Sequence, residues 1–121
     1  MTLEECYQSF GGDYAQAAAR FPSVALLGRF VVKFLKDPSF DALCAAFAAG
    51  NRAEAFRAAH TLKGLSANFS FQRLYASSAQ LTETLRPEGE AIPAAAAAEL
   101  EQVRRDYELT ASALRTFVAA G

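Results

Sequence analysis

Hydrophobic positions recur at helical spacing along most of the chain. From Pro22 to Lys36, and again after Asp37–Pro38, apolar residues return every three or four positions, which is the period of one helix face. The last stretch begins at Pro93, and its apolar stripe alternates between spacings of four and three, as a helix in a bundle requires. That stripe consists of Ala96, Leu100, Val103, Tyr107, Thr110, Leu114 and Phe117. The pattern predicts an all-α protein.

Capping and turn residues divide this pattern into separate helices. Asn51 to Glu54 resembles a capping box, in which a small polar residue is followed three positions later by Glu. We expect it to open a helix that ends near Phe69. Ser70 is expected to cap the next helix, which Pro87-Glu88-Gly89 breaks. Helices joined by such short turns predict an antiparallel four-helix bundle, with shorter helices on its N-terminal side.

Composition supports one helical domain over residues 1–121. Hydrophobic residues make up 52% of the chain, which is enough for a core, and four Pro and seven Gly leave few helix breakers. Twelve basic residues balance 13 acidic ones without any basic run, so we expect no nucleic-acid partner. No stretch approaches the roughly 20 apolar residues of a membrane span, and no signal-peptide pattern opens the chain. We therefore expect a cytoplasmic protein without a membrane partner.

Other recognisable chemistry is missing from the sequence. Cys6 and Cys44 are too few for a disulfide framework, and the single histidine, His60, has no carboxylate pair or zinc-site spacing around it. There is no Gly-rich phosphate loop and no kinase nucleotide signature. The sequence thus predicts no metal site, no cofactor and no enzyme active site of its own.

His60 lies on an unusual helix face. In helical projection, a stripe of small and large apolar residues faces the bundle: Ala55, Ala58, Leu62, Leu65 and Phe69. His60 projects to the opposite side, together with Ala53, Phe56, Arg57, Lys63, Gly64 and Ala67. A solvent face would normally be charged or polar throughout. This face instead combines an aromatic ring, small residues and two cations with the histidine.

The chemistry of this face fits phosphoryl acceptance. A neutral imidazole is a good nucleophile near pH 7, because its unperturbed pKa is about 6.5. Lys63, at i+3 from His60, is in reach of a phosphoryl group, which brings about two negative charges. Gly64 costs roughly 1 kcal/mol relative to Ala inside a helix, and close approach of a partner is a reason to keep it.

The motif resembles a known family. His60-Thr61-Leu62-Lys63-Gly64, followed by Ser66-Ala67-Asn68, is similar to the signature of histidine-containing phosphotransfer (HPt) domains of two-component phosphorelays. Leu74 and Leu81 also fall where that family has them, and we judge the resemblance to extend from about Asp13 to Phe117.

The resemblance implies specific roles. His60 would carry the phosphoryl group, Lys63 would stabilise its charge, and Gly64 would give clearance to the partner. The implied partners are receiver domains of response regulators or hybrid kinases, which supply the phosphorylated aspartate and Mg²⁺. We expect a monomeric, reversible carrier. The helix face itself, rather than the resemblance, predicts a receiver-docking surface of Phe56, Arg57, Gly64 and Ala67. Arg86, one turn beyond Thr82 on the adjacent helix, is a further candidate to reach the phosphate.

Two positions depart from the family pattern. Many members have Gly where this chain has Ser70, so the turn after the histidine helix can differ. Many bacterial members have Glu at the position of Thr82. Neither residue belongs to the His60-Lys63-Gly64 set, but both leave room for a different choice of partner.

Two alternatives to the carrier remain open. The chain can be a helical adaptor that docks receivers without being phosphorylated. It can also be an HPt-type segment of a chemotaxis-like histidine kinase, in which a separate ATP-binding domain phosphorylates the same fold. The intact His60, Lys63 and Gly64 favour a carrier over an adaptor, and the sequence does not separate a carrier from a kinase segment.

Overall fold

The chain is entirely helical over the residues that the computed structural model describes, 1–89 and 91–120. It forms seven α-helices in this part and no strand, which confirms the predicted fold class. The helices are α1 (Leu3–Ser9), α2 (Tyr14–Arg20), α3 (Val24–Phe34), α4 (Ser39–Ala48), α5 (Arg52–Asn68), α6 (Gln72–Leu85) and α7 (Ala96–Ala120).

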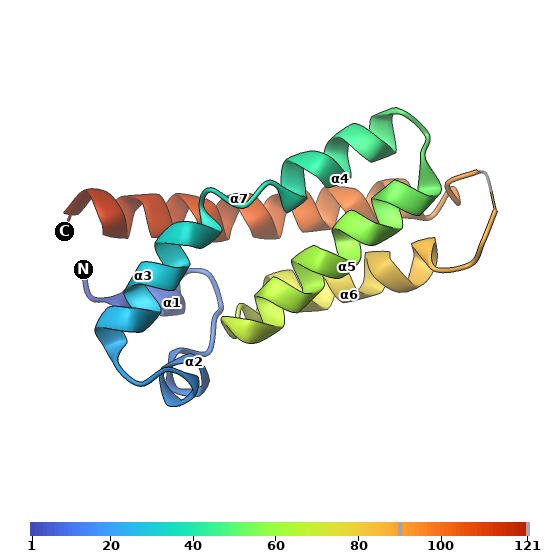
Figure 1. The fold of residues 1–121 in the computed structure, drawn as a ribbon. Coiled ribbons are helices and arrows are strands. Elements are labelled where there is room, and N and C mark those ends of the chain that lie inside the picture. Colours follow the sequence, from blue (N-terminus) through green and yellow to red (C-terminus); the bar gives the residue numbers. More distant parts are fainter. Residues whose placement is uncertain (90, 121) are drawn as a thin grey trace.

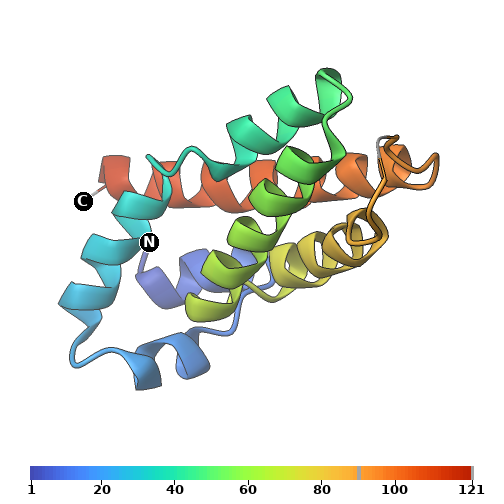
Figure 2. The same ribbon diagram turned by 45° about the vertical axis from the view of Figure 1, so that its right-hand side comes forward.

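The last four helices form the predicted antiparallel bundle. Figures 1 and 2 show that α4, α5, α6 and α7 run alternately in opposite directions, with α5 between α4 and α6. Opposite α5, side chains of α4 and α7 meet, and the rings of Phe40 and Tyr107 stack with centroids 4.1 Å apart. The apolar stripes face inward as expected, since Leu74, Ser78 and Leu81 of α6 are all fully buried.

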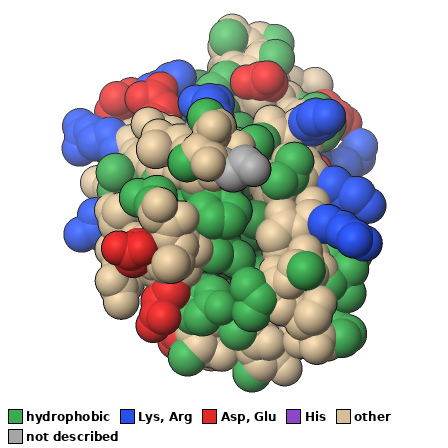
Figure 3. All heavy atoms as spheres, turned by 90° about the vertical axis from the view of Figure 1, so that its left-hand side faces the viewer, with side chains coloured by type: hydrophobic (Ala, Val, Ile, Leu, Met, Phe, Trp, Pro, Cys, Tyr) green, Lys and Arg blue, Asp and Glu red, His purple; other side chains and the backbone are tan. Residues whose placement is uncertain are grey.

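The three short helices close one end of the bundle. In Figure 1, α1 and α3 lie beside the C-terminal part of α7, and α2 lies near the end of α5; both chain ends are on the same side of the molecule. The Tyr7 hydroxyl donates a 2.8 Å hydrogen bond to the carbonyl of Phe69, which anchors α1 to the end of α5. Burial raises the pKa of this phenol, which keeps it a neutral donor. Viewed from this end, apolar side chains lie at the centre and charged ones around the rim (Figure 3).

The helix starts expected at Pro22 and at Pro93 differ from the observed ones. The helix expected from Pro22 begins at Val24, because the Ser23 side chain accepts a hydrogen bond from the Leu26 amide and serves as the cap. The helix expected from Pro93 begins at Ala96, after a turn in which the Ala96 amide donates to the Pro93 carbonyl. In both cases the proline lies in the turn that leads into the helix.

The cap at Asn51 is half of the predicted capping box. The Asn51 side chain accepts from the Glu54 amide at 3.1 Å, as expected. The Asn51 amide instead donates to the carbonyl of Ala46, across the left-handed Gly50 that ends α4. With that amide occupied, the Glu54 carboxylate pairs with Arg57 at 2.7 Å.

The prediction that Ser70 caps α6 is wrong. Ser70 has φ +56°, and the Phe71 and Ser70 amides donate to the carbonyls of Ser66 and Ala67. This is the left-handed ending of α5, a position at which glycine is preferred. A glycine at this position would adopt the positive φ without strain. The position before α6 is Phe71, which forms no side-chain cap.

Candidate functional site

His60 lies in the middle of α5 and is exposed. The helix packs through Ala55, Ala59, Leu62 and Ser66, all of which are buried. The observed buried face of α5 is therefore rotated slightly from the predicted one. Ala58 and Leu65 are only half-buried, whereas their neighbours Ala59 and Ser66 face the core. Small side chains on the inner face let α5 approach the bundle closely, and His60 remains on the outer face.

Lys63 and Gly64 stand one turn further along the same face. Lys63 is half-buried, and among the described residues its ammonium has no ion-pair or hydrogen-bond partner. A Cβ placed on Gly64 would meet nothing within 4 Å. The glycine is therefore not required by packing inside this chain. That observation disfavours a helix-packing role and fits the need for external clearance.

Phe56 lies one turn before His60, and the two rings are stacked. Their centroids are 5.9 Å apart with an interplanar angle of 15°. Phe56 is half-buried and packs against the edge of the core cluster. Phe56 thus contacts both the core and the imidazole, and its ring is called the platform below.

Arg86 approaches this platform from the end of α6. Its guanidinium carbon lies 5.2 Å from the centroid of the Phe56 ring, a cation–π arrangement. Glu83 holds it there through two hydrogen bonds, of 2.8 and 3.0 Å. These bonds lower the pKa of the Glu83 carboxyl, and the charges of Arg86, Lys63 and His60 lower it further. Glu83 was not singled out in the sequence, although its i,i+3 spacing to Arg86 was visible there.

The comparison with protein families agrees with this arrangement. A family model for the Hpt domain matches residues 37–115, well over half of the chain. This protein belongs to the Hpt domain family. Searches of curated proteins and of solved structures returned no significant match. Hpt domains are phosphocarriers that interact with receiver domains and serve histidine phosphotransfer in phosphorelays. Helices α1, α2 and α3 lie outside the matched residues of this Hpt domain.

Not all predicted docking residues of the Hpt domain lie together. The Arg57 side chain is 74% exposed and turns toward α4, where it lines a shallow pocket with Pro38, Ser39, Ala42, Glu54, Ala58 and Thr61. Its partner there is Glu54 of the same helix, and not a residue of α6. The structure therefore brings together His60, Phe56 and Arg86, and places Arg57 on the other side of the α5 face.

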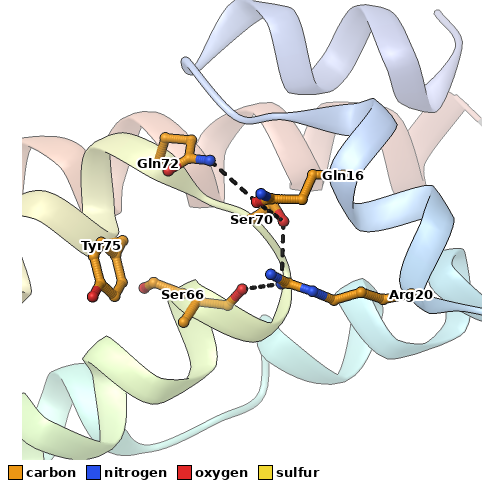
Figure 4. A pocket seen from close by; sticks show the side chains of 7 residues that line it. Gln16, Arg20, Ser66, Ser70, Gln72 and Tyr75 are labelled. Atoms are coloured by element: carbon orange, nitrogen blue, oxygen red, sulfur yellow. Dashed lines mark hydrogen bonds between the residues drawn. The ribbon is translucent and has the colours of Figure 1, made fainter.

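Ala67 borders a second pocket, at the end of the histidine helix (Figure 4). Arg20 of α2 donates to the carbonyls of Ala67 and Asn68 and to the Ser70 hydroxyl, the last at 3.2 Å. The Ser70 hydroxyl in turn donates to Gln16 at 2.8 Å. Arg20 thus places a cation at the C-terminal end of α5, where the helix dipole favours positive charge. This contact could not be predicted from the sequence, because Arg20 and Ala67 are far apart along the chain.

Thr82, the second position singled out in the sequence, bonds within its own helix. The side chain is fully buried, and its hydroxyl donates to the Ser78 carbonyl at 2.6 Å. The hydroxyl therefore bonds within α6, and the nearby carboxylate at the α6 edge is that of Glu83.

Residues 1–89 and 91–120 contain neither a cluster of metal ligands nor a helix suited to span a membrane. No three His, Cys, Asp or Glu side chains are grouped as metal ligands there. Over the same residues, no helix combines the length and apolar character of a transmembrane span.

Proposed function

We propose that this Hpt domain accepts a phosphoryl group on His60 from the aspartyl phosphate of a receiver domain, and passes it to the aspartate of another receiver. The unprotonated nitrogen of the neutral imidazole attacks phosphorus. A P–N bond forms as the P–O bond to the aspartate breaks, and the carboxylate leaves with the electron pair. The other ring nitrogen keeps its proton, so no base is needed in this chain.

The observation that carries the proposal is the exposure of His60 at the centre of an open face. The donor phosphate is held by another protein, so the imidazole must be reachable from outside the bundle. His60 meets this condition on the outer face of α5, and Gly64 leaves open space one turn away. A side chain at that position would project into the path of the receiver.

Two cations are assigned to the phosphoryl group. Lys63 is at i+3 from His60 and is not engaged by a carboxylate among the described residues. It would form a charge-assisted contact with the phosphoryl oxygens. Arg86 is the second candidate, because its guanidinium already lies over the ring that stacks on His60.

Receiver docking is assigned to the surface around these residues. Phe56 and Ala67 supply half-buried apolar area on either side of His60, while Gly64 supplies clearance and Arg57 lies at the rim. The proposal places Mg²⁺ on the receiver and gives this chain no cofactor. The carrier would act as a monomer.

The test is incubation with phosphorylated receiver domains, read on a phosphate-affinity gel. We expect a label on the wild-type protein that is acid-labile and alkali-stable, as a phosphohistidine is, and none on His60→Gln. Binding of receivers without any label would identify an adaptor instead. A label that required a kinase ATP-binding domain, with none transferred from receivers, would identify a kinase segment.

A further inference from the structure

Four side chains stand in series across the α5–α6 edge. His60 stacks on Phe56, the guanidinium of Arg86 lies over Phe56, and Glu83 binds Arg86 through both carboxylate oxygens. The proposed carrier mechanism uses His60, Phe56 and Arg86. It leaves no task for Glu83, although this carboxylate holds one of the two cations assigned to the phosphoryl group.

We propose that Glu83 is a positioning residue that competes with the phosphoryl group on His60 for the guanidinium of Arg86, and thereby keeps that group transferable. This inference rests on the proposed function. In the unphosphorylated protein, the hydrogen bonds of Glu83 hold Arg86 over the Phe56 ring. After phosphorylation, Arg86 divides its hydrogen bonds between Glu83 and the phosphoryl oxygens, so the phosphorylated state is less stabilised than with a free arginine.

The chemistry of the guanidinium makes this competition direct. Its planar fork of donors matches a carboxylate and a phosphoryl group equally well, and both bind it in the same two-pronged way. Arg86 and Glu83 are 49% and 60% exposed, so the arginine side chain is free to swing between partners. The guanidinium and the imidazole both adjoin the Phe56 ring.

Glu83 also lies within the electrostatic field of the site. Besides Arg86, the charge of Lys63 stabilises its carboxylate form. A phosphoryl group on His60 would add about two negative charges in the same place. Glu83 and the phosphoryl group would then repel each other as well as compete for cations, which acts in the same direction as the competition for Arg86.

A matched arrangement elsewhere in the chain serves as the control. Glu101 pairs with Arg104 at i,i+3, and the guanidinium of Arg104 lies 5.7 Å from the centroid of the Phe40 ring. It has the same three components as the Glu83 arrangement, but His60 is the only histidine in the sequence, so no imidazole is stacked there. Glu101→Gln therefore removes an equivalent surface carboxylate without touching the site.

The experiment phosphorylates His60 chemically with phosphoramidate, so that no receiver is needed. The imidazole attacks phosphorus and forms a new P–N bond. The P–N bond of phosphoramidate breaks, and ammonia leaves with its electron pair. The lifetime of the phosphohistidine is then followed by phosphorus NMR in wild type, Glu83→Gln, Glu83→Asp and Glu101→Gln. We expect Glu83→Gln to lengthen the lifetime by about threefold to tenfold, the effect of removing one nearby like charge. Glu83→Asp and Glu101→Gln should behave as wild type.

Arg86→Ala tests whether Glu83 acts through the arginine. Adding Glu83→Gln to Arg86→Ala should change the lifetime much less than Glu83→Gln does alone. Equal lifetimes in wild type and Glu83→Gln would overturn the inference, as would an equal lengthening in Glu101→Gln. If neither phosphoramidate nor phosphorylated receivers label wild-type His60, the inference and the proposed function fail together. If phosphoramidate does label His60 but phosphorylated receivers do not, only the proposed donor is wrong.

Discussion

The rings of Phe56 and His60 lie nearly parallel, with centroids 5.9 Å apart, and Phe56 in turn packs against the core. His60 is exposed, and its ring is supported by that of Phe56. A catalytic group held in one orientation reacts faster than one that samples several rotamers. The platform links the bundle core to the reacting atom.

Replacing the platform should slow transfer more than it destabilises the fold. Phe56→Leu keeps apolar volume but removes the stacked ring, so we expect nearly unchanged stability and transfer from a phosphorylated receiver slowed by about threefold to tenfold. Phe56→Ala should also lower the free energy of unfolding, by about 1–2 kcal/mol for a half-buried ring. Single-turnover kinetics and denaturant unfolding measure the two effects. Transfer at the wild-type rate by Phe56→Leu would remove the platform from the mechanism.

Lys63→Ala should slow phosphoryl acceptance by about tenfold, the equivalent of one lost contact worth about 1.4 kcal/mol. The reason is that no other lysine stands at one turn from His60. The control is Lys36→Ala, an exposed lysine in the link between α3 and α4. Both variants are compared by rapid-quench transfer kinetics. Equal rates for the two variants would show that Lys63 does not contact the phosphoryl group.

Substitutions of Gly64 should affect the stability of the fold and the binding of a receiver in different ways. Because the position is open, Gly64→Ala should stabilise the isolated protein by about 0.5–1 kcal/mol through helix propensity. Gly64→Gln should fold equally well but weaken receiver binding by about tenfold or more, since its side chain projects from the docking face. Gly28→Gln, at another open helical glycine, is the control and should bind normally. Calorimetric titration with a receiver gives the affinities, and normal affinity of Gly64→Gln would contradict the clearance role.

The left-handed turn at Ser70 carries a stability cost. Its φ of +56° is strained for a residue with a Cβ, while its hydroxyl bonds Arg20 and Gln16. Ser70→Ala keeps the strain and loses these bonds, so it should destabilise the protein by about 1 kcal/mol. Ser70→Gly relieves the strain and should be more stable than Ser70→Ala by about 1–2 kcal/mol. Chemical denaturation checks the order, and a less stable glycine variant would contradict this reading of the turn.

The two thiols should differ in reactivity. Cys6 is fully buried, and burial raises the pKa of its thiol, whereas Cys44 is partly exposed. At a given pH a raised pKa leaves less thiolate, which is the reactive form. With a disulfide reagent at pH 8, Cys44 should react on the order of tenfold faster or more, and Cys6 at a comparable rate only after unfolding. Equal reaction rates in the native protein would place Cys6 nearer the surface.

The sequence was informative where a property depends on one helix. Helical projection placed His60 on the outer face of α5, opposite the small residues that pack inward, because periodicity alone decides that geometry. The buried stripe was wrong at two places, where Ala59 and Ser66 are buried instead of Ala58 and Leu65. Two adjacent alanines do not differ in the pattern, and at the second place the pattern favoured the apolar Leu65 over the serine.

Properties that depend on two helices were harder to predict. The contact of Arg86 with Phe56 requires the register of α6 against α5, and Arg20 reaches Ala67 from α2 across 47 positions of sequence. The conformation of Ser70 was missed for a different reason. A serine before a helix usually signals an N-cap. Here Ser70 instead belongs to the end of α5, because its amide and that of Phe71 donate to carbonyls of that helix.

The most direct test of the central claim is the return step. Wild-type protein phosphorylated on His60 is purified, mixed with an excess of an unphosphorylated receiver and Mg²⁺, and both proteins are quantified over time on a phosphate-affinity gel. The carrier account predicts that each phosphoryl group lost from His60 appears on the receiver aspartate, faster than hydrolysis without the receiver. Loss from His60 at the hydrolysis rate, with none gained by any receiver that binds, would contradict it.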